Sequence, residues 1–86
     1  MSRRKRLPKM RVVERKLGRE RAWGQCWQHR GLVEIDPRQD SKSYLNTMLH
    51  EMLHLYFKPA SEWTVANVAD RMSDALWRKG YRRIMD

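Results

Sequence analysis

The stretch 42–58, KSYLNTMLHEMLHLYFK, constrains the fold of this chain more than any other. Within it, the pentapeptide HEMLH (residues 50–54) places two histidines four residues apart. Each residue turns an α-helix by about 100°, so the two imidazoles project about 40° from each other on the same side. Glu51 follows about 60° beyond His54. We therefore expect a helix over residues 42–57 with three reactive side chains on one face.

The opposite side of this helix is expected to be apolar. Its apolar residues recur at the spacing i, i+3, i+4, i+7, which is typical of a helix that buries one face. The stripe and the histidines are in phase with the same helix, so one face would be buried while the other stays open to solvent. The apolar stripe consists of Leu45, Met48, Leu49, Met52 and Tyr56.

The pattern H-E-x-x-H on a helix is typical of zinc-dependent hydrolases. In such sites two imidazoles hold the ion, and the glutamate between them activates a water molecule. The sequence thus predicts Zn²⁺ as the cofactor, with His50 and His54 as ligands and Glu51 as the catalytic base. The alternative is that two surface histidines and a glutamate occupy a solvated face.

A catalytic zinc ion needs a third protein ligand beside an open position for water. Glu62 is the first choice, because it lies eight residues after His54. The turn at residues 58–60 would fold a second helix back beside the first and bring this carboxylate toward the histidines. Its alternative role is that of an acid in the first turn of the second helix, where it interacts favourably with the helix dipole.

Four other side chains have suitable chemistry. Asp70, further along the second helix, is a weaker ligand candidate and fits better as a partner of a ligand or as a surface acid. Cys26 and His29 are also weaker candidates, since a lone cysteine is more often a small buried apolar residue. Asp36 follows an expected strand, and we expect it to orient a ligand histidine by accepting its second ring proton.

The segments before the motif helix predict a short antiparallel sheet. Residues 11–17 begin with a β-branched pair, and residues 32–36 alternate as in a strand with a buried face. The latter would form a hairpin with residues 21–30, turning near residues 29–31. A second helix begins after its N-cap Ser61. Its expected apolar face consists of Val65, Val68, Ala69, Met72, Ala75 and Leu76. The fold class is therefore α+β, a short antiparallel sheet packed on the motif helix plus a C-terminal helix.

The positive charge is concentrated in the first third of the chain. The net charge is +9; residues 1–30 hold eleven Lys and Arg against two acids, whereas residues 31–86 hold eight of each sign. Such an excess attracts nucleic acid or another polyanion. We expect residues 1–10 to form a flexible basic arm, although a solubilising tail fits the same composition. The candidate nucleic-acid contacts in the arm are Arg3, Arg4, Lys5 and Arg6.

The remaining composition predicts one small intracellular domain over residues 11–86. A chain of 86 residues buries only about 60–65% of its unfolded surface, so the core is modest. The single cysteine excludes an intramolecular disulfide and fits a reducing compartment. No apolar run approaches the roughly 20 residues that a membrane span requires, and the basic N-terminus lacks the apolar stretch of a secretory signal.

The motif and its surroundings resemble small zincin-type metallopeptidases, and most of all the compact SprT-like peptidases of phages and mobile elements. The residues that carry the resemblance are YLNTMLHEMLH at 44–54, after a strand that ends in IDP at 35–37. A Ser-Glu pair at 61–62 and the segment LWRKGY at 76–81 extend it. It covers about residues 22–83 and is specific around the two histidines.

The resemblance implies a minimal zincin-like domain in which His50, His54 and Glu62 bind zinc. Glu51 would be the general base. The chain lacks the glycine and third histidine of metzincins and the second lobe of a full-size peptidase. We expect a zinc-dependent hydrolase that cleaves a peptide or protein substrate in the cytoplasm, that of the host cell if a phage encodes it. The alternative is a zinc-stabilised binding module whose basic N-terminal region binds nucleic acid or an acidic partner, and a metal-dependent nuclease or amidase is a third hypothesis.

Overall fold

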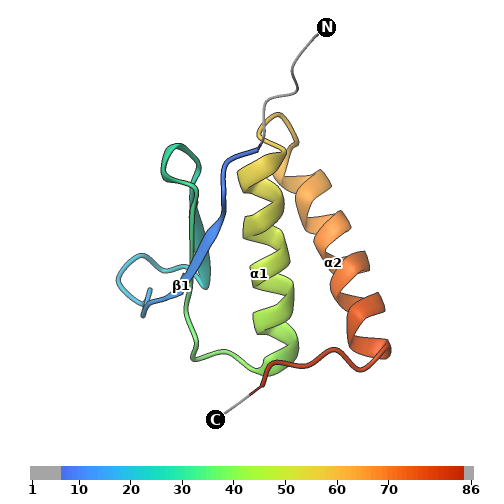
Figure 1. Ribbon diagram of the computed structural model, residues 1–86. Helices are drawn as coiled ribbons and strands as arrows, with labels where there is room; N and C mark the ends of the chain where they lie inside the picture. The colour runs from blue at the N-terminus through green and yellow to red at the C-terminus, as the bar shows by residue number, and fades with distance from the viewer. Residues whose placement is uncertain (1–6, 85–86) are drawn as a thin grey trace, which may run out of the picture.

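A three-stranded sheet, a central helix and a second helix lie side by side in the computed structural model, which describes residues 7–84 (Figure 1). The expected α+β class is confirmed. Within residues 7–84, neither helix is both long and apolar enough to cross a membrane. In chain order the elements are β1 (Arg11–Glu14), β2 (Gly24–Trp27), the 3₁₀ helix η1 (Gln28–Arg30), β3 (Leu32–Ile35), α1 (Ser41–Tyr56) and α2 (Glu62–Arg78).

The sheet has the order β1-β3-β2, with β3 in the centre. β2 and β3 form the expected antiparallel hairpin, which turns through η1 and Gly31, whose φ is 59°. β1, however, runs parallel to β3, with Arg11 opposite Leu32. The chain reverses once between β1 and β2 and again in the hairpin, so β3 runs in the direction of β1. The sheet is therefore mixed, so the prediction of an antiparallel sheet is confirmed for β2 and β3 and wrong for β1.

The core lies between β3 and α1. Val33 and Ile35 on β3 are fully buried and pack with Tyr44 and Leu55 of α1. Of the expected apolar stripe of α1, only Leu49 is buried, and the others are half-buried. The reason is that α1 lies between the sheet and α2 (Figure 1), so it buries side chains in two directions rather than one.

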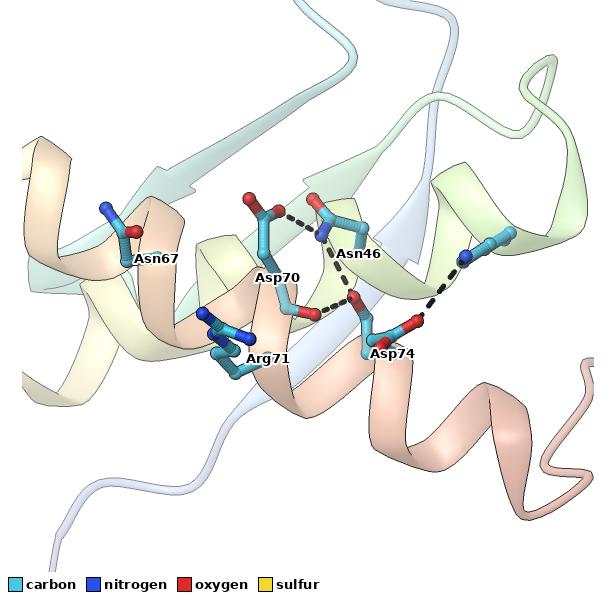
Figure 2. A pocket seen from close by; sticks show the side chains of 7 residues that line it. Asn46, Asn67, Asp70, Arg71 and Asp74 are labelled. Atoms are coloured by element: carbon cyan, nitrogen blue, oxygen red, sulfur yellow. Dashed lines mark hydrogen bonds and ion pairs between the residues drawn. The ribbon is translucent and has the colours of Figure 1, made fainter.

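The contact between α1 and α2 is partly polar. Asn46 of α1 donates from Nδ2 to Asp70 Oδ1 at 2.8 Å and to Ser73 Oγ at 3.0 Å (Figure 2). Asp70 is thus a partner of Asn46 and is not among the residues gathered around the histidines. On the far side of α2, Val68 and Met72 are 39% and 40% exposed, although helical spacing assigned both to the buried face.

Both helices begin at side-chain caps. Asp40 accepts a hydrogen bond from the backbone N–H of Ser43 at 2.9 Å, and Ser61 accepts one from Thr64 at 3.1 Å. Such caps satisfy backbone donors that have no partner within the helix. They fix the residues at which α1 and α2 begin.

Glu34 is a buried carboxylate on the face of β3 opposite α1. It is 7% exposed and accepts hydrogen bonds from Arg15 Nε at 2.6 Å, Gln25 Nε2 at 2.7 Å and Trp27 Nε1 at 2.6 Å. Arg15, followed by Gln25 and Trp27, lowers the pKa of this carboxyl to about 2 against the desolvation that burial imposes. These bonds connect the central strand to β2 and to the residue that follows β1.

Acidification should therefore destabilise the fold through Glu34. Because its pKa is lower in the folded than in the unfolded chain, its contribution is fully present above an ordinary pKa of about 4.5 and is lost as the pH falls toward about 2. Losing charged hydrogen bonds of this kind costs about 1–3 kcal/mol. Urea unfolding at pH 5 and pH 3 measures the effect. Glu34→Gln should be less stable at pH 5 and change less between the two pH values; an identical pH dependence would contradict this role.

Candidate metal centre

The two motif histidines converge on one face of α1, near its C-terminal end. His50 Nε2 and His54 Nε2 are 3.2 Å apart, and their side chains are 19% and 23% exposed. Residues four apart on a helix lie one above the other, which places the two rings against each other. Both imidazoles thus face solvent through the same opening.

Glu62 approaches the same point from the first turn of α2. Its two carboxylate oxygens lie 2.7 Å from His50 Nε2 and 2.6 Å from His54 Nε2. The possible ligand atoms of these three residues all lie within 4.8 Å of one another. Two imidazole nitrogens and a carboxylate oxygen are a donor set that suits zinc. The tertiary structure therefore brings together the three predicted ligands, and zinc binding stays a prediction.

The histidines also hold Glu62 in its ionised form. Burial works against ionisation, but the hydrogen bond from His54 and the charges of His50 and His54 keep the pKa of this carboxyl below its ordinary value. A metal ligand must be deprotonated to bind. The local electrostatics thus favour the ionised form of Glu62, and each imidazole must likewise be neutral before it binds a metal.

Glu51 lines the same hollow but lies outside the ligand cluster. The hollow has a volume of about 540 Å³, and its walls come from β2 with η1 on one side and from α1 with the start of α2 on the other. Burial raises the pKa of Glu51, and Glu62 raises it further, whereas the two histidine charges oppose the shift. A carboxylate with a raised pKa beside possible metal ligands is suited to accept and return a proton.

β2 approaches α1 closely at Gly24. A Cβ atom at this position would lie 2.5 Å from Thr47 Cγ2 and 3.0 Å from Glu51 Cγ, closer than non-bonded carbons tolerate. The missing side chain therefore allows the strand to reach the helix beside Glu51. Gln28 adds a second connection, since its Nε2 donates to the carbonyl oxygen of His54 at 2.8 Å. Neither role was predicted from the sequence, because a glycine and a glutamine far from the motif carry no local signal.

The weaker candidates lie elsewhere or contribute no ligand atom. Cys26 and His29 line the hollow, but neither belongs to the group whose ligand atoms converge. The expected role of Asp36 is wrong. Its carboxylate is buried and accepts hydrogen bonds from the backbone N–H of Leu17 and from Arg38. The hydrogen bond from Leu17 holds the loop after β1 in place. The basic arm residues Arg3, Arg4, Lys5 and Arg6 lie outside the described residues.

Comparison with known proteins identifies no relative of this chain. No protein-family model, curated protein or solved structure matches the chain. The relation to zincin-type and SprT-like peptidases therefore stays a prediction that rests on the motif. The function has to be argued from the geometry of the hollow.

Proposed function

We propose that the protein is a zinc-dependent hydrolase that cleaves peptide bonds in peptide or protein substrates. The observation that carries the proposal is the position of Glu51. A site that uses zinc only to hold the fold together needs its ligands and no further carboxylate, whereas here a half-buried glutamate lines the same hollow as His50, His54 and Glu62. The donor set leaves a position for water, as catalytic zinc sites do.

Glu51 would act as the proton carrier of the reaction. It would accept a proton from the attacking water and pass it to the leaving amine. Zinc, when bound, supplies Lewis-acid polarisation of the water and of the scissile carbonyl. The raised pKa of Glu51 fits the first half of its role, because a carboxylate that holds a proton more strongly is a better base toward the attacking water.

The edge of β2 would align the substrate. Among residues 7–84, β2 pairs only with β3, so its other edge has no partner strand, and Gly24 and Cys26 line the hollow beside the histidines. An extended peptide can add to such an edge through backbone hydrogen bonds. This arrangement favours peptides over other substrates with a hydrolysable carbonyl.

The test combines metal content with hydrolysis. Protein purified without a histidine tag and reconstituted with zinc should contain about one zinc ion per chain by elemental analysis. It should cleave an unfolded protein such as reduced casein, stop when a chelator removes the metal, and resume when zinc is restored. Protein that retains no zinc would contradict the metal centre. Protein that retains zinc but cleaves no unfolded substrate would favour the zinc-stabilised binding module.

A further inference from the structure

The loop between β1 and β2 presents free positive charge away from the metal centre. Lys16, Arg19 and Arg21 are all exposed (Figure 1, light blue loop). Within residues 7–84, none of the three forms an ion pair with a carboxylate. The acid of this loop, Glu20, is instead paired with Arg15 at 3.3 Å. The three cations are therefore available to an anionic partner.

The loop is held in one shape by a buried anchor. Leu17 is fully buried, and its backbone N–H donates to Asp36 Oδ2 at 2.9 Å. Its carbonyl accepts hydrogen bonds from the N–H groups of Glu20 at 3.1 Å and Ala22 at 3.5 Å. Arg21 has a φ of 52°, a left-handed conformation that is uncommon outside glycine. A loop that is already ordered loses little further conformational entropy when a partner binds.

Trp23 ends this loop as an exposed aromatic platform. Its backbone is fixed, because its carbonyl accepts from the N–H of Asp36 at 2.9 Å and from Gln39 Nε2 at 3.2 Å. The residue is nevertheless 56% exposed. It borders one hollow of about 300 Å³ together with Arg21 and Arg38, and a second of about 530 Å³ beside the start of α1. The indole ring of Trp23 thus lies between the two hollows, and Arg21 lies at the rim of the smaller one.

Two acids lie near Trp23, Asp36 and Asp40, and only the first is neutralised by a cation. The Asp36 carboxylate is 1% exposed, and Arg38 binds it through both Nε at 2.9 Å and a terminal nitrogen at 2.7 Å. Asp40 caps α1 and stays exposed at the rim of the larger hollow, so an anion is favoured on the side of the smaller one. In the smaller hollow the charge that remains open beside the indole is therefore that of Arg21, with Arg19 and Lys16 in the same loop.

We propose that this loop is a binding site for single-stranded nucleic acid, in which a base stacks on Trp23 and the adjoining phosphates contact Arg21, Arg19 and Lys16. Any of the bases can stack on an aromatic side chain, so this contact does not depend on the nucleotide sequence. A group of cations beside the aromatic ring binds the phosphates of the nucleic-acid backbone. A duplex fits poorly, because its bases are already stacked on each other. The site is separate from the metal centre and binds whether or not the chain hydrolyses peptides.

The experiment measures binding of a fluorescently labelled oligothymidylate of about 10 nucleotides by anisotropy. Trp23→Leu should weaken binding about tenfold and leave its salt dependence unchanged, since a stacking contact is lost but no charge. Trp23→Phe, which retains an aromatic face, should recover most of the affinity. The double variant Lys16→Gln, Arg21→Asn should lower the slope of log K against log salt by about 1.4; asparagine tolerates the backbone conformation at residue 21.

A matched control variant and a folding check keep the proposal open to refutation. Trp63→Leu removes a tryptophan that is 75% exposed at the start of α2, and it should leave the affinity unchanged. Circular dichroism and thermal unfolding establish that each variant is folded. If Trp23→Leu and Trp63→Leu bind alike, or if duplex DNA and heparin bind as tightly as the single strand, the chain is only a general polycation and the site at Trp23 is wrong.

Discussion

Glu51→Gln should lower the rate of peptide hydrolysis by about 10²- to 10⁴-fold while the protein keeps its zinc. Glutamine has the shape of glutamate but cannot accept and return a proton. Because Glu51 lies outside the group of converging ligand atoms, its replacement removes proton transfer and not metal binding. The measurement is kcat for an unfolded protein substrate, with zinc content determined on the same samples.

A matched exchange elsewhere separates chemistry from charge. Asp74→Asn also converts a carboxylate to an amide, but Asp74 pairs with Lys42 and Arg78 on the surface of the helical layer. This variant should hydrolyse peptides at the rate of the unmodified protein. Equal loss in both variants would show that net charge, not Glu51, governs the rate. A Glu51→Gln variant that cleaves normally would remove Glu51 from the mechanism.

His54→Ala should abolish stable zinc binding, with an affinity loss of more than about a hundredfold. Substitution of groups that merely support a ligand already costs about 10- to 100-fold in affinity, so loss of a ligand itself costs more. His54 Nε2 lies 3.2 Å from His50 Nε2 and 2.6 Å from Glu62, so two donors would remain without the third. Elemental analysis after dialysis, followed by competition with a chelator of known zinc affinity, measures the change.

His29→Ala is the control for this prediction. His29 is a histidine on the opposite wall of the same hollow, but it is not in the group of converging ligand atoms. The His29→Ala variant should therefore keep about one zinc ion per chain. If His29→Ala loses zinc as His54→Ala does, the ligand set is different from the one proposed. If neither loses zinc, the metal binds outside this hollow.

Local sequence features were sufficient to predict the two helices and the reactive face of the first. The expected helix over residues 42–57 is observed at Ser41–Tyr56, and Ser61 caps α2 as expected. The reason is that helix periodicity and capping depend on residues within one or two turns. The convergence of His50 and His54 follows from their spacing alone. The short turn before α2 is also local, and so the choice of Glu62 over Asp70 could be made from the sequence.

Contacts between distant segments could be decided only by the tertiary structure. The parallel pairing of β1 with β3, the burial of Leu17, and the hydrogen bond from the Leu17 N–H to Asp36 all depend on which strand occupies the centre of the sheet. The exposure of Met72 depends on how α2 packs on α1. The spacing of apolar residues predicts which side chains share a helix face, but not which element packs against that face. By itself the sequence determined which side chains share a face of each helix. The tertiary structure decided what each face meets, because strand pairing and layer packing join residues that no local pattern relates.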